Sequence, residues 1–77
     1  SREGQIVLEG EPFVDAVAEF NRYNERKIVI ADPSLQGERL VGWFRTNDPE
    51  GFANAAAASL GAGVRIEGNT IFVHASG

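Results

Sequence analysis

The sequence predicts an α+β fold made of two related units, the first in the order strand-helix-strand and the second in the order strand-helix-strand-strand. Two stretches with the apolar spacing of helices, residues 13–23 and 49–60, are each flanked by short runs rich in strand-forming residues. A Gly-Asn pair near the C-terminus is typical of a two-residue hairpin. Similar proline-containing segments begin the two helices, Pro12-Phe13 in the first and residues 49–52 in the second, which is consistent with an internal duplication.

The first helix is predicted from apolar residues that recur on one helical face, namely Phe13, Ala16, Val17 and Phe20. A short strand-forming run, Gln5–Leu8, precedes this helix and is expected to be broken by Gly10 and Pro12. We expect the helix to end near Tyr23, with Asn24 in the left-handed conformation that closes many helices.

The second strand is predicted at residues 27–31, which are rich in β-branched side chains. It stops at Asp32, because a residue that precedes proline is restricted in its backbone conformation. Residues 32–38 have the chemistry of turns, with Asp32 placed to bond to the local backbone and Leu35 as an apolar anchor. This stretch is expected to link the two units.

The second unit begins with a strand at residues 40–45, whose side chains alternate between two faces. We assign Leu40 and Phe44 to the core, on the same face as Gly42, and we assign Val41, Trp43 and Arg45 to the opposite face.

The second helix is predicted over residues 49–60. Asn47 or Asp48 can accept hydrogen bonds from the free amides of its first turn, and proline is favoured at the first helical position. Gly61 is a good C-terminal cap. The small side chains of residues 55–58 make this helix slim, which suits a position between two other layers.

The last two strands are predicted at residues 64–67 and 70–74, joined by the Gly68-Asn69 turn. Glu67 and Thr70 then flank the turn, which fixes the register of the hairpin. The expected cross-strand pairs are Ile66 with Ile71 and Val64 with Val73 on the core side, and Arg65 with Phe72 on the outer side.

Composition indicates one folded domain, residues 5–77, preceded by a tag or linker at residues 1–4. The chain is 43% hydrophobic and 23% charged, which is typical of globular domains. The absence of cysteine excludes disulfides and thiolate metal sites. A net charge of -4 disfavours nucleic acid and anionic membrane surfaces, so we expect neither as a partner. No apolar run is long enough to span a bilayer, which suggests a cytosolic protein or one domain of a longer protein.

No pattern in the sequence predicts catalysis, a metal site or a cofactor. His74 is the only histidine, and we expect it to be solvated or at a strand end. Glu11, Asp15 and Glu19 recur every four residues, and we interpret them as the solvent face of the first helix rather than as a site for a hard cation or as paired catalytic carboxylates. Residues 61–63 do not form a phosphate loop, because they follow a helix instead of preceding one. A small enzyme or ligand carrier is therefore the least favoured hypothesis.

Two aromatic residues, Trp43 and Phe72, are the most informative about function, because alternation places both on faces opposite the core. Exposed aromatic side chains beside aliphatic ones usually mark a contact surface. We predict that Val41, Trp43, Arg65 and Phe72 bind a protein partner through an outer sheet face. The alternatives are strand addition at an exposed sheet edge, or a sheet whose outer face is covered by another part of a longer protein.

Four segments of the chain resemble the C-terminal part of FecR-family sigma-factor regulators: residues 18–24, 28–33, 42–45 and 48–52. The resemblance covers about residues 6–74. It implies a module similar to the secretin and TonB N-terminus short domain (STN), in which two helices are sandwiched between two small sheets. The chain departs from the family at the start of the first helix, where Glu11 stands in place of a small hydroxyl residue.

The resemblance implies the periplasmic, signal-receiving domain of a single-pass inner-membrane protein. In the family this domain binds the N-terminal signalling domain of a TonB-dependent outer-membrane transducer of the iron or siderophore type. It thereby controls a sigma factor held by a cytoplasmic segment that these 77 residues do not include. The alternative is that the chain is itself the signalling domain of a TonB-dependent receptor or secretin, although the Asn-Arg-Tyr and Gly-Trp-Phe-Arg segments favour the regulator.

Overall fold

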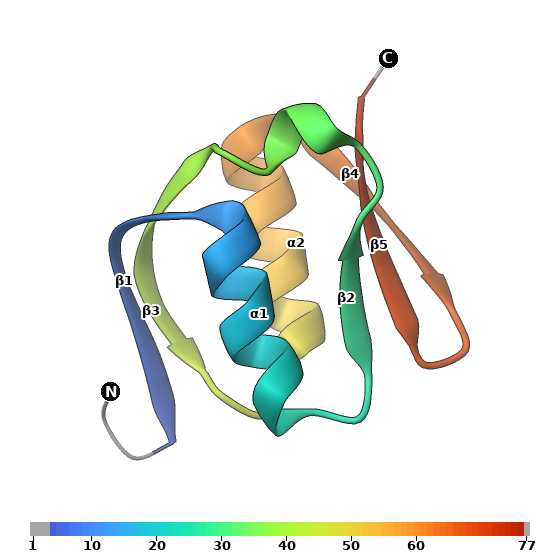
Figure 1. Cartoon of the computed structure of the whole chain (residues 1–77). Coiled ribbons are helices and arrows are strands. Elements are labelled where there is room, and N and C mark those ends of the chain that lie inside the picture. Colours follow the sequence, from blue (N-terminus) through green and yellow to red (C-terminus); the bar gives the residue numbers. More distant parts are fainter. Residues whose placement is uncertain (1–3, 77) are drawn as a thin grey trace.

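The computed structural model describes residues 4–76, so the predicted linker at residues 1–4 lies outside the described part except for Gly4. In chain order, the elements are β1 (Gln5–Pro12), α1 (Phe13–Tyr23), β2 (Lys27–Ile30), the short 3-10 helix η1 (Pro33–Leu35), β3 (Arg39–Arg45), α2 (Pro49–Leu60), β4 (Ala62–Glu67) and β5 (Thr70–Ala75) (Figure 1). This order confirms the prediction from the sequence.

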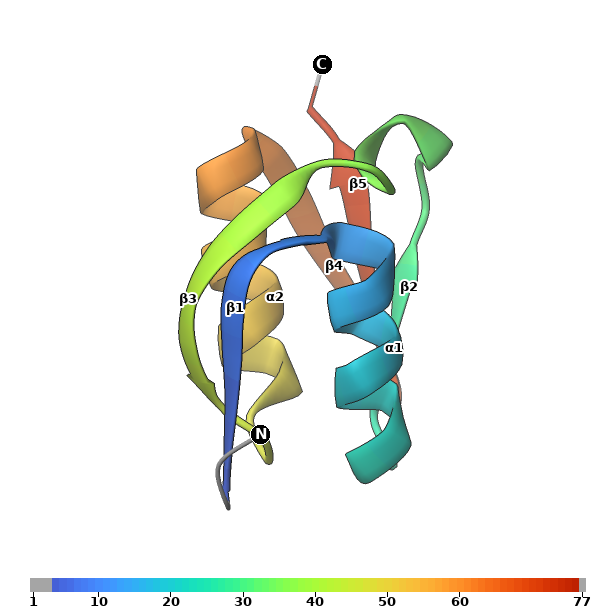
Figure 2. The ribbon, with the colours of Figure 1, turned by 60° about the vertical axis from the view of Figure 1, so that its left-hand side comes forward.

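The two helices lie between two small sheets, as Figures 1 and 2 show from two directions. Strands β1 and β3 form an antiparallel pair on one side of the helices. On the other side, β5 lies between β2, to which it is parallel, and β4, to which it is antiparallel. The predicted α+β sandwich of two helices between two sheets is therefore confirmed.

Strand β1 is longer than predicted, because Gly10 forms a bulge instead of ending the strand. The register with β3 shifts between Glu9 and Glu11, and Gly10 has a φ of 111°, which favours glycine. Pairing then continues to Pro12, which lies opposite Arg39. The bulge lets one strand run from the start of the domain directly into α1.

The hydrophobic core is centred on phenylalanine rings from both helices and β3. Phe20 of α1 and Phe52 of α2 stack with ring centroids 4.2 Å apart, and Phe44 and Phe52 pack edge to face with centroids 5.0 Å apart. Leu40 is buried, and Phe44 is partly buried against the core, which confirms the core assignment of both residues. Gly42 leaves the space that the Phe44 ring needs, since an added Cβ would lie 2.9 Å from two ring atoms.

The hairpin has the predicted register, but one of its predicted core residues is exposed. Ile66 pairs with Ile71, Val64 pairs with Val73, and Arg65 pairs with Phe72. Ile71 and Val73 are fully buried in the central strand, whereas Ile66 is 41% exposed. Ile66 lies beside the turn on an edge strand, so the helices cover it less than the central strand. Its assignment to the core is therefore wrong.

Helix α2 has the predicted ends. The Asp48 carboxylate accepts a hydrogen bond from the Gly51 N–H at 2.9 Å, and Pro49 occupies the first turn. A side chain at Gly51 would collide with this carboxylate, because an added Cβ would lie 2.2 Å from Asp48 Oδ2. Gly61 closes the helix in the left-handed conformation, with a φ of 66°. Local sequence signals thus determine both ends of this helix.

Asn24 does not adopt the predicted left-handed conformation at the end of α1. Its backbone is extended, with φ of -130° and ψ of 143°. The Asn24 side-chain amide instead donates hydrogen bonds to Phe20 O at 2.9 Å and to Thr46 O at 2.8 Å. Because the side chain satisfies the last-turn carbonyl, the backbone is free to continue directly toward β2.

The linker between the two units has the predicted turn. The main-chain N–H of Ser34 donates to the Asp32 carboxylate at 3.0 Å, and this bond holds the pKa of that carboxyl below its usual value. Leu35 is buried in the core, as expected of an apolar anchor. The 3-10 helix η1 therefore fixes the linker against the rest of the domain.

The free edge of β2 is covered by a side chain of α1. The Asn21 amide donates to Ile28 O at 3.0 Å, and its oxygen accepts from the Ile28 N–H at 2.9 Å. The side chain thus bonds to β2 as a neighbouring strand would.

We expect Asn21→Ala to lower the free energy of unfolding by about 1–3 kcal/mol, because two partly buried main-chain groups lose their partner. Urea denaturation followed by circular dichroism measures this loss. Asn54→Ala, at an exposed position of α2, is the control and is expected to change stability by less than about 0.5 kcal/mol. Equal losses in the two variants would contradict the structural role of the Asn21 amide.

Candidate protein-binding surfaces

The outer side of the two-stranded sheet carries exposed apolar side chains. Val41 is 79% exposed and Trp43 is 63% exposed on β3. Val7 of β1 is directly opposite Trp43. We call these three residues the β1–β3 face. Alternation in β3 produces this surface, because Leu40, Gly42 and Phe44 occupy the inner side.

The outer side of the three-stranded sheet carries a smaller apolar group. Phe72 of the central strand lies between Val29 of β2 and Arg65 of β4. The Arg65 guanidinium lies 4.3 Å from the centre of the Phe72 ring and also pairs with the Glu67 carboxylate. We call Val29, Arg65 and Phe72 the β2–β5–β4 face. The Phe72 side chain is half-buried on this face.

The four residues predicted to bind a partner do not form one continuous face. Val41 and Trp43 belong to one sheet, Arg65 and Phe72 belong to the other, and the helices lie between the sheets (Figure 1). Alternation correctly places all four side chains away from the core. It carries no information about which strands share a sheet, so the prediction of a single face is wrong.

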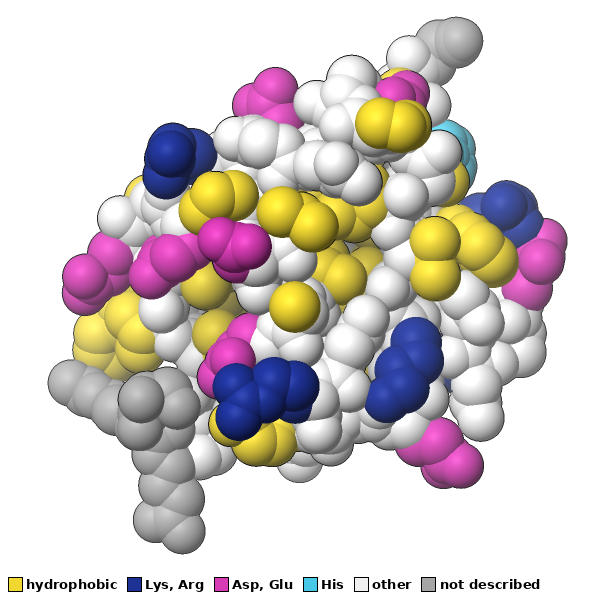
Figure 3. Space-filling view, viewed as in Figure 1, with side chains coloured by type: hydrophobic (Ala, Val, Ile, Leu, Met, Phe, Trp, Pro, Cys, Tyr) yellow, Lys and Arg dark blue, Asp and Glu magenta, His cyan; other side chains and the backbone are white. Residues whose placement is uncertain are grey.

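A groove runs between β1 and α1, a feature that the sequence did not predict. It has a volume of about 270 Å³ and is lined by Ile6, Val7, Leu8, Glu11, Asp15, Ala16 and Glu19. We call it the acidic groove. Acidic side chains gather on this side of the molecule, with hydrophobic side chains between them (Figure 3). The three carboxylates interpreted as a solvent face therefore form the rim of a groove.

His74 and the nearby glycines take part in packing and in ending a helix. The His74 ring lies against Gly63, where an added Cβ would be 2.6 Å from the ring, and His74 Nδ1 is 3.0 Å from Ala75 O. Gly61 caps α2, and residues 62 and 63 begin β4.

Over residues 4–76, no group of three histidine, cysteine or acidic side chains is placed to hold a metal ion. None of the helices in that part of the chain is long and apolar enough to cross a membrane.

Comparison with known proteins identifies the fold but not the family. No model of a protein family matches the chain, and no curated protein matches its sequence. Two crystal structures of a "putative anti-sigma factor" from Parabacteroides distasonis are similar, each with a TM-score of 0.76, at 22% and 21% sequence identity. In both, the similarity covers 96% of this chain and 35% of the other chain. This chain therefore has the fold of one part of that larger protein.

Proposed function

We propose that the chain is the periplasmic signal-receiving domain of a FecR-like transmembrane sigma-factor regulator. Its partner in this proposal is the N-terminal signalling domain of a TonB-dependent outer-membrane transducer. The main support is the similarity of 96% of the chain to part of a protein described as an anti-sigma factor. The four segments that resemble FecR-family regulators support the same assignment.

The β1–β3 face is the docking surface that we propose for the transducer domain. Val41 and Trp43 are the most exposed large hydrophobic side chains among the described residues. Tryptophan is enriched among the residues that contribute most to the affinity of protein interfaces. On the opposite sheet, Val29 is 40% exposed and Phe72 is only half-buried, so the β2–β5–β4 face exposes less apolar surface.

Isothermal titration calorimetry against the signalling domains of the TonB-dependent transducers from the same organism tests this proposal. We expect at least one of them to bind. Trp43→Ser is expected to raise the Kd by about 30-fold or more, the usual effect of losing a central aromatic contact. Tyr23→Ser is a matched control, because Tyr23 is another exposed aromatic residue, 52% exposed at the end of α1.

Two outcomes would contradict the proposal. If none of these transducer domains binds, the assignment as their receiver is wrong. If Trp43→Ser and Tyr23→Ser bind as the unchanged domain does, the β1–β3 face is not the docking surface. Binding to the periplasmic part of a FecR-like regulator, in place of a transducer domain, would favour the signalling domain of a receptor or secretin.

A further inference from the structure

The edge of β1 that faces away from β3 carries main-chain groups directed outward. The N–H of Thr46 donates to Gly4 O at 3.1 Å, so Gly4 and Thr46 are a hydrogen-bonded pair of the β1–β3 ladder. Hydrogen-bonded and non-hydrogen-bonded residue pairs alternate along an antiparallel ladder. The register then turns the N–H and C=O groups of Gln5, Val7 and Glu9 away from β3. The Glu9 N–H follows this pattern, because it donates to the Glu11 carboxylate at 2.5 Å instead of to β3.

The acidic groove runs along this edge. Its lining includes Ile6 and Leu8, which point to the core, together with Val7, which lies between them on the strand. The groove therefore includes the edge of β1 itself, and the N–H and C=O groups of Val7 point toward it. The edge of β2 differs, because the Asn21 side chain covers it. The bulge at Gly10 limits the usable part of the β1 edge to residues 5–9.

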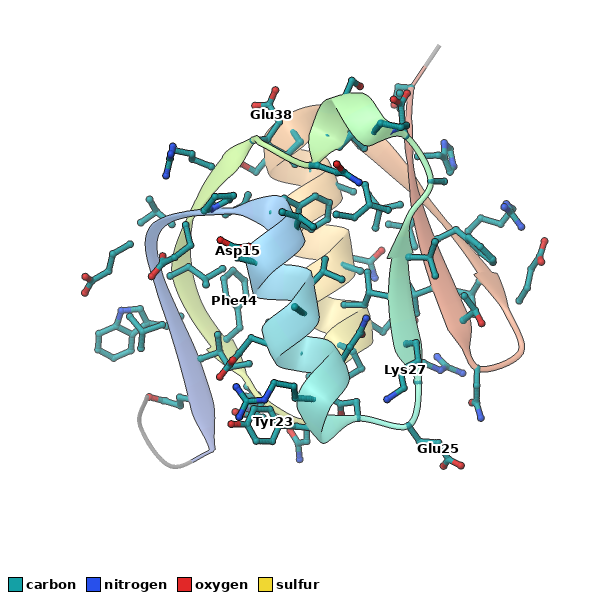
Figure 4. All side chains as sticks on the ribbon, in the orientation of Figure 1. Asp15, Tyr23, Glu25, Lys27, Glu38 and Phe44 are labelled. Atoms are coloured by element: carbon teal, nitrogen blue, oxygen red, sulfur yellow. The ribbon has the colours of Figure 1, made fainter. Side chains whose placement is uncertain are left out.

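The opposite wall of the acidic groove is negatively charged. Asp15 is exposed and projects from α1 on the side of β1 (Figure 4), and Glu19 lies one turn further along, paired with Arg22 at 3.1 Å. Residues four apart on a helix are separated by about 6 Å along its axis. Alternate residues of a strand are separated by about 6.6 Å. Basic side chains at alternate positions of an extended segment therefore match the spacing of these carboxylates.

We propose that the acidic groove binds an extended, basic segment of a partner protein, which adds to the edge of β1 as a third strand. Main-chain hydrogen bonds to Gln5 and Val7 hold the segment, as in other cases of strand addition. Lysine or arginine side chains place their charges beside Asp15 and Glu19. The net charge of -4 favours such a partner. This surface shares Val7 with the β1–β3 face but includes neither Val41 nor Trp43, and the inference does not depend on the transducer.

An NMR titration with an acetylated and amidated hexapeptide of alternating valine and lysine tests the inference. We expect chemical-shift changes to concentrate in residues 5–9 and 15–19. We also expect the amide of Val7 to exchange more slowly with solvent in the bound state, because it gains a hydrogen-bond partner. Two further peptides carry N-methyl groups on alternate amides, one peptide on the odd-numbered amides and the other on the even-numbered amides. Only one of these two sets of amides faces β1, so we expect one methylated peptide to lose binding and the other to retain it.

Charge variants test the acidic wall. Asp15→Lys is expected to weaken binding of the peptide by about fivefold or more, because like charges then face each other. Glu25→Lys, at an exposed position beyond the end of α1 (Figure 4), makes the same charge change away from the groove and is expected to retain most of the affinity. A peptide of alternating valine and glutamate is expected not to bind. Circular dichroism confirms that both variants are folded.

Several results would overturn the inference: no shift changes at millimolar peptide, changes that map elsewhere, equal binding of the glutamate peptide, or equal losses in the two lysine variants. Self-association of the domain through β1, detected by sedimentation, would show that a second copy occupies the edge instead. Trp43→Ser is expected to leave the affinity for the peptide unchanged. An experiment that contradicts peptide binding in the acidic groove can therefore be told apart from one that contradicts transducer docking on the β1–β3 face.

Discussion

Phe52→Ala is expected to lower the free energy of unfolding by about 3–5 kcal/mol, the largest single effect that we expect in this domain. The Phe52 side chain is 1% exposed, stacks on Phe20 and packs edge to face with Phe44, so it joins both helices to β3. A domain of this length has a total stability of about 4–12 kcal/mol, so the variant loses a large share of it.

Urea denaturation followed by circular dichroism measures this loss. Phe72→Ala is the matched control, since it removes the same side chain from a half-buried position on the outer sheet surface. We expect it to cost less than about 2 kcal/mol, because a half-buried side chain loses less apolar burial and its contact with Arg65 lies on the sheet surface. If the two variants lose equal stability, the core is not centred on Phe52.

Gly42→Ala is expected to lower the free energy of unfolding by about 1–3 kcal/mol, through strain in the backbone and displacement of Phe44. Gly42 has a φ of 154°, and an added Cβ would lie 2.9 Å from Phe44 Cε2 and Cζ. Moving this ring disturbs its contact with Phe52, whose centroid is 5.0 Å away. Thermal and urea denaturation of the variant measure the cost.

Gly37→Ala is the control for this substitution. Gly37 has open space where a Cβ would be placed, and it lies in the linker. We expect this variant to be neutral or slightly more stable, because alanine restricts the unfolded chain. In the background of Phe44→Leu, the cost of Gly42→Ala is expected to fall, since the two residues share one space. Equal effects of the two glycine substitutions would contradict the role assigned to Gly42.

The sequence predicts most of the fold because local chemistry determines most of the element boundaries. Asp48 and Pro49 start α2, Gly61 ends it, and the Gly68-Asn69 turn sets the register of the hairpin. Errors arise where a tertiary contact replaces the local signal. Asn24 uses its side chain to reach Thr46, which is 22 residues away in the sequence.

The candidate surfaces were predictable only in part, because they depend on which strands share a sheet. Alternation correctly places Trp43 and Phe72 outside the core, but pairing between distant strands assigns them to different sheets. The acidic groove depends on the same pairing. It exists because β1 pairs with β3 on one side only, while Asp15 and Glu19 of α1 face its other edge.

Chemical-shift mapping of the complex with a transducer signalling domain tests the central claim most directly. The domain is labelled with nitrogen-15, and the unlabelled transducer domain that binds it is added. We predict that the largest shift changes map to the β1–β3 face around Val41 and Trp43, with small changes at Arg65 and Phe72 on the opposite sheet. Shift changes centred on the opposite sheet, or none with any of these transducer domains, would contradict the account.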